Sequence, residues 1–305
     1  MKKILLALIT IVWGCLAQAQ ETYLFASRDT CDLYLDIYRP AEGADTTFQG
    51  IRKPAIIHVF GGGFVTGSRR DGYLVNWYKL LNQEGYTVVA IDYRLGMKGY
   101  KMKKGLSGLL NASDRFLLSQ EVGVEDVFSA VRFLARNDVG VDVDNLVLAG
   151  NSAGAIITLA SAQALANGQV PDLPEGFNFK GAISFAGAII STSGAPKFQS
   201  APCPVLLFHG TVDKAVAYNK LAAFGRGLWG SNYLAKKFKK NGYPYCFYRM
   251  KDRTHDVAGY HIALWPYEKA FLEQNVMLGH ARTVDALVED DSLPRWDNIK
   301  INDIY

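Results

Sequence analysis

The apolar residues of this chain fall into short runs, and the period of each run indicates the element that it forms. Leu33, Leu35 and Ile37 alternate with polar or aromatic neighbours, which is the period of a strand with one buried face. Other runs are continuously apolar, as expected for strands inside a sheet. These predicted interior strands cover residues 54–60, 86–92, 145–149, 180–186, 204–209 and 245–250.

Segments of helical character separate these strands. They cover residues 71–84, 119–137, 155–166, 216–241 and 259–278, the fourth being a helix-rich region. Strands that alternate with helices require crossover connections, which predicts an α/β fold with a mostly parallel central sheet and helices on both faces. An antiparallel hairpin over residues 21–40 fits the edge of that sheet.

Two stretches lack a clear period. Residues 97–114 are polar and predict a long loop after the strand at 86–92. Residues 282–305 predict either a docked tail or a partly disordered end. We therefore expect one domain over residues 20–281 and a C-terminal tail over 282–305.

The first nineteen residues are typical of a secretory signal peptide. Lys2 and Lys3 precede the apolar residues 4–13, which are too few to span a bilayer, and Ala-Gln-Ala at 17–19 offers a cleavage site. A lipoprotein signal ending at Cys15 is the competing interpretation, but a bulky tryptophan two residues before it fits poorly. Both interpretations predict an exported protein, secreted or periplasmic.

The charge and cysteine content of the chain exclude some classes of binding partner and ligand. The formal net charge is +4, and removal of residues 1–19 deletes two lysines and no acid, leaving +2. No dense basic patch occurs, so a nucleic-acid partner is not expected, and beyond the signal no apolar stretch suits a membrane span. Cys31, Cys203 and Cys246 lack metal-ligand spacing, and three thiols cannot all pair with one another.

Residues 150–154 (G-N-S-A-G) lie between a predicted strand and a predicted helix. A G-x-S-x-G in that context describes a nucleophile elbow, in which the turn is so tight that side chains around the serine must be nearly absent. Ser152 would stand at the tip. The amide of Ala153 would lie at the helix N-terminus, where the partial positive charge favours an oxyanion.

An acid for the same site is expected after the elbow and at the carboxyl end of a strand. Asp172 and Glu175 lie at the wrong end of their strand. Asp213, directly after the strand at 204–209, is the leading candidate almost by exclusion. Its alternative role is to cap a helix.

The base must come from the five histidines of the chain. His255 occupies the loop after the last predicted strand, from which an imidazole can fold over the serine. His58 lies within a strand and His209 precedes the acid. His261 and His280 lie at or beyond the final helix. Position therefore favours His255.

Donors for an oxyanion are expected before the elbow. Gly61, Gly62 and Gly63 follow the strand at 54–60, so backbone N–H groups there can point into a site, and Phe64 can wall an acyl pocket. A glycine-rich turn without this role is the alternative.

These motifs, in this order, resemble the α/β-hydrolase superfamily, and most of all its esterase/lipase branch with an H-G-G-G-F loop. The resemblance covers about residues 50–280 and rests on five blocks: residues 61–64 (G-G-G-F), 92–95 (D-Y-R-L), 150–154, 209–213 (H-G-T-V-D) and His255. It implies that Ser152 is the nucleophile, His255 the base and Asp213 its orienter.

The resemblance also implies oxyanion donors at the amides of Ala153, Gly62 and Gly63. Asp92 and Arg94 look like scaffold residues of the strand-end loop. No cofactor and no metal are implied.

The chain departs from this family at two places. Phe60 stands where the family has a histidine that braces the glycine loop, so we expect altered loop positioning without loss of activity. Residues 97–114 are longer than the family's loop and carry several lysines, so they form either a lid over the site or a solvated basic loop.

Together these observations predict a secreted serine carboxylesterase that hydrolyses short-chain acyl esters, with acetyl or feruloyl esters of carbohydrates as candidate substrates. Two alternatives stay open: a prolyl-oligopeptidase-type serine peptidase, and a non-catalytic binding protein on a hydrolase scaffold. The sequence leaves the natural ester and the oligomeric state undetermined.

Overall fold

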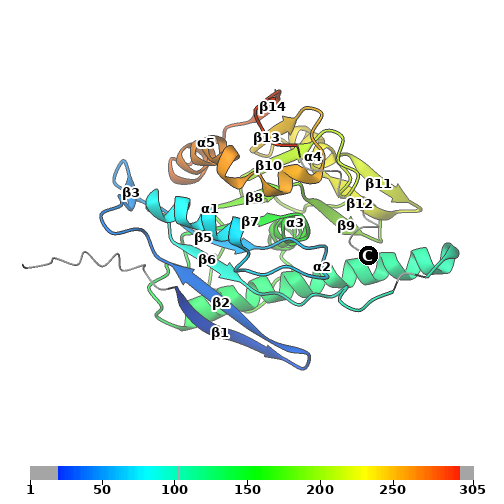
Figure 1. Cartoon of the computed structure of the whole chain (residues 1–305), viewed down its shortest axis with the longest axis horizontal. Coiled ribbons are helices and arrows are strands. Elements are labelled where there is room, and N and C mark those ends of the chain that lie inside the picture. The colour runs from blue at the N-terminus through cyan, green and yellow to red at the C-terminus, as the bar shows by residue number, and fades with distance from the viewer. Residues whose placement is uncertain (1–19, 102, 296–305) are drawn as a thin grey trace, which may run out of the picture.

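A nine-stranded sheet forms the centre of the protein (Figure 1). The computed structural model describes residues 20–101 and 103–295. The strand order across the sheet is β1-β2-β6-β5-β7-β8-β10-β13-β14. Its strands are β1 (Glu21–Arg28), β2 (Cys31–Tyr38), β5 (Ala55–Val59), β6 (Val88–Ile91), β7 (Leu146–Asn151), β8 (Gly181–Phe185), β10 (Val205–Gly210), β13 (Tyr245–Met250) and β14 (Val284–Val288).

The direction of the strands confirms the predicted fold class. All pairs from β6 across to β14 are parallel, whereas β1 and β2 form an antiparallel hairpin and β2 joins β6 antiparallel. Every residue of β5, β6, β7, β8 and β10 is buried, because helices cover both faces of the sheet. Continuous apolar runs therefore mark the interior strands.

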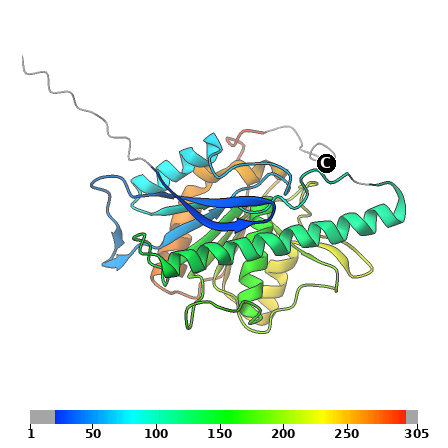
Figure 2. The same ribbon diagram turned by 90° about the horizontal axis from the view of Figure 1, so that it is seen from below.

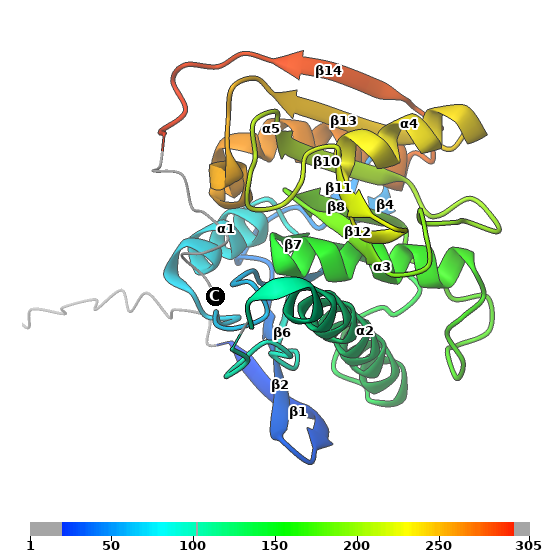
Figure 3. The same cartoon turned by 90° about the vertical axis from the view of Figure 1, so that its right-hand side faces the viewer.

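Helices lie on both faces of the sheet (Figure 3). They are α1 (Gly72–Gln83), α2 (Gly105–Arg136), α3 (Ala153–Ala166), α4 (Ser231–Asn241) and α5 (His261–Phe271), with a 3₁₀ turn η1 (His255–Gly259) and a π-helical segment η2 (Leu272–Met277). Helices α1 and α5 pack together on one face, and α2 and α3 on the other. Across the described part of the chain, none of these helices has both the length and the apolar character needed to cross a membrane.

The predicted loop over residues 97–114 is wrong in its second half. Helix α2 begins at Gly105 and runs for 32 residues, so its N-terminal end projects beyond the sheet (Figure 2). Leu106, Leu109 and Leu110 recur at helical spacing but remain exposed, because nothing in the described chain packs over them. Gly105 and Gly108 stand among these leucines, and glycines in a short polar stretch favour a loop, so the helical spacing was masked in the sequence.

The helix-rich region predicted over residues 216–241 is helical only from Ser231 onward. Before it lies a hairpin of β11 (Lys220–Ala223) and β12 (Arg226–Gly230), which pairs with β9 (Ala188–Ser191) in a second, three-stranded sheet. Phe224 and Gly225 both have positive φ angles, 51° and 78°, so they form the turn of that hairpin. A further two-stranded sheet joins β3 (Thr47–Phe48) and β4 (Ile51–Arg52).

The end of the chain is part of the fold. Strand β14 pairs in parallel with β13 at the edge of the main sheet, so the sheet extends past the expected domain boundary at residue 281. Beyond β14 the chain docks on the loop after β13, where an Arg253 guanidinium donates to the Asp290 carbonyl and the Tyr260 hydroxyl donates to the Pro294 carbonyl. The predicted signal peptide at 1–19 and the last residues of the predicted tail, 296–305, lie outside the described residues.

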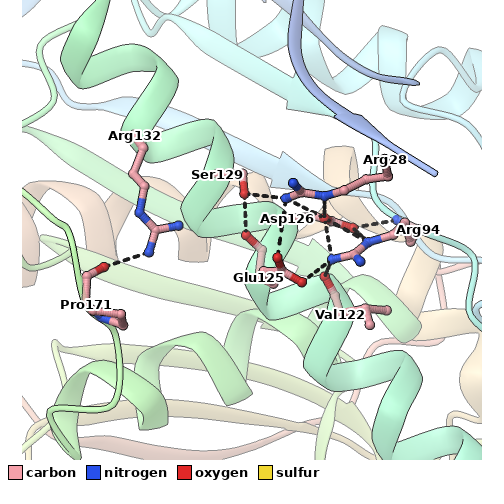
Figure 4. A network of polar contacts seen from close by, with 8 residues as sticks. All are labelled: Arg28, Arg94, Val122, Glu125, Asp126, Ser129, Arg132 and Pro171. Atoms are coloured by element: carbon pink, nitrogen blue, oxygen red, sulfur yellow. Dashed lines mark hydrogen bonds and ion pairs between the residues drawn. The ribbon is translucent and has the colours of Figure 1, made fainter. Parts of the chain in front are cut away.

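A network of ion pairs fastens α2 to the rest of the fold (Figure 4). Asp126 of α2 is fully buried; its Oδ1 accepts from the Nε of Arg94 at 3.0 Å and from the Nε of Arg28 at 3.4 Å. Arg94 also pairs with Glu125. Arg94 thus joins the loop after β6 to α2, in keeping with the scaffold role expected of it; Asp92 pairs with Arg69 at 2.5 Å.

Candidate active site

The turn between β7 and α3 has the geometry of a nucleophile elbow. Strand β7 ends at Asn151 and α3 begins at Ala153, leaving Ser152 alone between them with φ 53° and ψ −119°. A non-glycine residue at positive φ is strained and is kept only where its surroundings hold it. A Cβ on Gly150 would lie 2.4 Å from the Gly154 carbonyl oxygen, and one on Gly154 would lie 2.0 Å from the Val59 oxygen. Both positions therefore require glycine, as the sequence predicts.

The structure brings Ser152, His255 and Asp213 together in one chain of hydrogen bonds. The Oγ of Ser152 lies 2.7 Å from the Nε2 of His255, whose Nδ1 lies 2.8 Å from the Oδ2 of Asp213. Asp213 follows β10 and His255 opens η1 directly after β13, so both side chains reach the site from the carboxyl ends of neighbouring strands. With Nδ1–H directed at the carboxylate, the Nε2 lone pair faces the serine hydroxyl.

The carboxylate of Asp213 is buried and held by several donors. Its Oδ1 accepts from the amides of Ala215 at 2.8 Å and Val216 at 3.0 Å. Burial alone would raise the pKa of Asp213, but hydrogen bonds from His209 and His255 outweigh it and hold that pKa well below its usual value. Asp213 is therefore an anion at neutral pH.

Three of the other histidines have partners away from Ser152. The Nδ1 of His58 bonds the hydroxyl of Tyr78 at 2.7 Å in the core. His261 is buried against Phe185, and burial lowers its pKa to about 3. The exposed His280 lies 3.3 Å from the side-chain oxygen of Gln274.

The fourth, His209, contacts the acid. Its Nε2 lies 3.2 Å from the Oδ2 of Asp213, a contact that the sequence analysis missed. In the sequence, the only sign of this contact is that His209 lies near the end of a predicted strand, four residues before Asp213.

The glycine loop after β5 lies against the elbow. A Cβ on Gly61 would come within 2.8 Å of the Asn151 amide nitrogen and 3.1 Å of the Ser152 Cβ. Gly62 and Gly63 have positive φ angles of 112° and 64°, which glycine adopts without strain. The loop thus brings its backbone close to the serine, on the side where Ala153 begins α3.

Phe60 supports this loop by apolar packing. Its buried ring lies 4.6 Å from the ring of Tyr93, centroid to centroid. A Cβ on Gly67 would approach the Phe60 ring to 2.8 Å, so the loop closes tightly over it. At this position, van der Waals contact replaces the hydrogen bonds that a histidine would make.

A small cavity opens at Ser152. It measures about 60 Å³, and its walls come from the elbow, the glycine loop, α2, β9 and β12. Its lining residues are Gly63, Phe64, Phe116, Ser152, Ala153, Ile156, Ile190, Ala215, Val216, Leu228 and His255. Phe64 lines it as the sequence suggests, whereas Phe116, Ile190 and Leu228 come from elements that the sequence did not place near the site.

The loop before α2 approaches the same region. The amide of Met97 donates to the carbonyl of Phe64 at 3.0 Å, so the chain that leads to α2 is tied to the wall of the cavity. Phe116 follows on the fourth turn of α2. The helix, more than the loop, therefore meets the cavity.

The described residues form no ligand set of the kind that metal sites use. Within residues 20–101 and 103–295, no three histidine, cysteine, aspartate or glutamate side chains lie together as metal ligands would. Cys31, Cys203 and Cys246 are free thiols; Cys31 is exposed and the other two are buried. Burial raises the pKa of Cys203 to about 12, so its thiol stays protonated.

Comparison with known proteins agrees with this geometry. Residues 14–199 match the model of the carboxylesterase family, which is more than half of the chain. The chain belongs to the carboxylesterase family.

Two curated relatives illustrate the similarity. The chain is 29% identical over 125 residues to Esterase E4 of Myzus persicae, covering 40% of this chain and 20% of that protein. It is 28% identical over 178 residues to the chlorogenic acid esterase of Aspergillus niger, covering 57% of this chain and 29% of that protein. The chain thus spans less than a third of either relative.

Solved structures support the fold of this member of the carboxylesterase family. Esterase 2 of Thermogutta terrifontis aligns with a TM-score of 0.56 at 22% identity, over 83% of this chain and 94% of that one. The same enzyme with propionate bound gives a TM-score of 0.57 at 21% identity. At this identity the likeness establishes a shared α/β-hydrolase fold.

Proposed function

We propose that the protein is a serine carboxylesterase in which Ser152 is the nucleophile, His255 the base and Asp213 its orienter. The observation that carries this proposal is the unbroken chain of hydrogen bonds from Ser152 Oγ through His255 to Asp213, at 2.7 and 2.8 Å. It stands at an elbow turn inside a member of the carboxylesterase family. Of the two alternatives, this family match favours ester hydrolysis over peptide hydrolysis, and the complete hydrogen-bonded chain favours an enzyme over a binding protein.

Acylation begins when the Ser152 hydroxyl passes its proton to His255 Nε2 while Oγ bonds to the ester carbonyl carbon. The carbonyl oxygen takes the negative charge, and Asp213 stabilises the imidazolium that forms. The bond to the alcohol oxygen then breaks as His255 returns the proton to the leaving alcohol. Water, activated by the same imidazole, releases the acid from the acyl-enzyme and restores Ser152.

The oxyanion is held by backbone amides. Ala153 is the first residue of α3, so its N–H has no acceptor within the helix and lies at the positive end of the helix dipole. Gly62 and Gly63 supply the other donors from the facing loop. Gly63 and Ala153 line the cavity together with Ser152, as such donors must.

The size of the cavity supports a short acyl group. Its volume of about 60 Å³ is well below the roughly 150 Å³ of an engineered cavity that holds benzene. An acetyl or propionyl group fits such a space, whereas an aromatic acyl group such as feruloyl requires the walls to move. Among the candidate substrates, acetyl esters of carbohydrates are therefore favoured over feruloyl esters.

We further propose that the enzyme acts outside the cytoplasm. The support is the signal-peptide pattern of residues 1–19, with a charged start, a short apolar run and an Ala-Gln-Ala site. Expression of the full chain in a bacterial host, followed by N-terminal sequencing of the exported product, tests this. A mature N-terminus at Gln20 supports secretion of a free protein. A lipid-modified Cys15 at the N-terminus would show instead that the protein is lipid-anchored.

The activity is tested with p-nitrophenyl esters of two to eight acyl carbons. Wild-type protein should hydrolyse the acetate fastest, and Ser152→Ala should lose kcat by about 10⁶-fold, the loss typical of removing a triad serine. His255→Ala should lose activity to a similar degree, since the two residues act as one unit. His261→Ala serves as the matched control: activity lost there and kept in His255→Ala would reverse the assignment of the base.

A further inference from the structure

His209 is a buried polar residue that the hydrolytic steps above do not use. It is the next-to-last residue of β10 and has no exposed surface. Its ring has three polar contacts: Nδ1 lies 2.8 Å from the Ser231 hydroxyl, and Nε2 lies 3.1 Å from the Val216 carbonyl and 3.2 Å from the Asp213 carboxylate. Both ring nitrogens of a core histidine are thus engaged, and one of them faces the acid of the proposed triad.

The contacts determine which nitrogen carries the proton. Both neighbours of Nε2 are oxygens that can only accept, so Nε2 must carry a hydrogen. In the neutral ring Nδ1 then accepts from the Ser231 hydroxyl at 2.8 Å; the same hydroxyl also lies 3.2 Å from the carbonyl oxygen of Gly187. Ser231, the first residue of α4, is thus compatible with the tautomer that the two acceptor oxygens at Nε2 require.

Asp213 consequently sits between two imidazoles. Its Oδ2 faces His255 Nδ1 at 2.8 Å and His209 Nε2 at 3.2 Å, while its Oδ1 is held by two backbone amides. The amides anchor one oxygen to the loop after β10. His209 lies on β10 and contacts the other oxygen, Oδ2. It therefore fixes the rotation of the carboxylate at which Oδ2 points toward His255.

We propose that His209 is a positioning residue for the esterase reaction: it orients the Asp213 carboxylate toward His255 and shares its negative charge. This inference rests on the proposed function. A carboxylate with one fewer donor is a stronger base, and its rotation is held less firmly. Without His209, Asp213 would favour the protonated form of His255 more strongly but hold the ring less precisely for proton transfer from Ser152.

Three substitutions separate this role from simple core packing. In His209→Gln the amide nitrogen extends to the place of Nε2 and can still donate to Asp213. In His209→Asn the shorter amide occupies the place of Nδ1, so it can bond Ser231 but cannot reach the carboxylate. In His209→Leu both contacts are lost.

The experiment measures kcat and KM for p-nitrophenyl acetate from pH 5 to 9, with folded protein quantified by circular dichroism and thermal unfolding. We expect His209→Asn and His209→Leu to lose kcat by about 10- to 100-fold with little change in KM, because a small misplacement of a catalytic group can cost up to about 100-fold. In the pH profiles of kcat/KM for these two variants, the acidic limb should move to higher pH. His209→Gln should stay within about threefold of wild type with an unshifted limb.

His58→Asn is the matched control, because His58 is an equally buried strand histidine whose partner is Tyr78. It should lower the unfolding temperature without moving the acidic limb. Equal kcat in folded His209→Gln, His209→Asn and His209→Leu, or an unmoved limb in the latter two, would overturn the positioning role. An inactive wild type, or a Ser152→Ala variant as active as wild type, would instead contradict the proposed function.

Discussion

Gly154 is a position at which one added methyl group should disturb the proposed active site. A Cβ added there would lie 2.0 Å from the carbonyl oxygen of Val59 and 2.6 Å from that of Phe60. Both oxygens belong to the backbone that leads from β5 into the glycine loop. Gly154→Ala therefore sets the elbow helix directly against the segment that supplies the proposed oxyanion donors.

The size of the effect follows from the distance. A Cβ essentially never approaches a heavy atom closer than 3.0 Å, so the carbonyl at 2.0 Å must move by about 1 Å. A displacement of that size at a catalytic group typically costs on the order of 100-fold in rate, about 2.7 kcal/mol. Because backbone must shift on both sides of the site, we also expect a lower unfolding temperature.

The assay compares kcat/KM for p-nitrophenyl acetate and the thermal unfolding midpoint between wild type and Gly154→Ala. Gly72→Ala is the matched control: it starts α1, its added Cβ would meet nothing within 4 Å, and alanine should be neutral or slightly stabilising there. If the kcat/KM of Gly154→Ala stays within threefold of the wild-type value, close packing between the elbow and the glycine loop does not determine the geometry of the site.

Three further predictions test other parts of the structure. Phe116→Ala should enlarge the cavity and shift the preference of the enzyme from acetate toward hexanoate and octanoate esters; an unchanged chain-length profile would separate Phe116 from acyl selection. Burial raises the pKa of Glu268 well above its usual value, so above about pH 4.3 the unfolded carboxyl loses a proton that the folded one keeps, and stability falls as pH rises. Glu268→Gln should therefore raise the unfolding midpoint more at pH 8 than at pH 5, and an equal gain at both would contradict a protonated Glu268. Tyr260→Phe removes the hydroxyl that bridges the Asp256 carboxylate and the Pro294 carbonyl, so it should loosen the loop of His255 and lower kcat several-fold; full activity would show that this bridge does not steady the loop.

The sequence alone determined the features that depend on neighbouring residues. Apolar runs of five or six residues that are separated by helical segments are typical of strands buried on both faces, so the parallel sheet was predictable. The turn at Ser152 requires glycine at 150 for a local steric reason, because a Cβ there would meet Gly154 within the same five residues, whereas glycine at 154 is required by the distant backbone of Val59. Asp213 and His255 follow from the rule that sites form at the carboxyl ends of parallel strands, and the structure places both within hydrogen-bond distance of the expected partners.

The tertiary structure decided the features that depend on contacts between distant segments. The first turns of α2 carry exposed leucines among glycines, and β14 lies within a stretch without an apolar period, so the sequence alone marked neither as a packed element. Phe116 reaches the cavity because the pairs of Asp126 with Arg28 and Arg94 fix where α2 crosses the sheet.

His209 shows the same limit at the level of one side chain. Its place on β10 was readable, but its role depends on Ser231 of α4 and on the rotation of the Asp213 carboxylate. Local patterns determine strands and turns because the atoms involved are close along the chain. Which side chains meet at Ser152 is decided only when the packed helices and the sheet bring distant residues within hydrogen-bond distance.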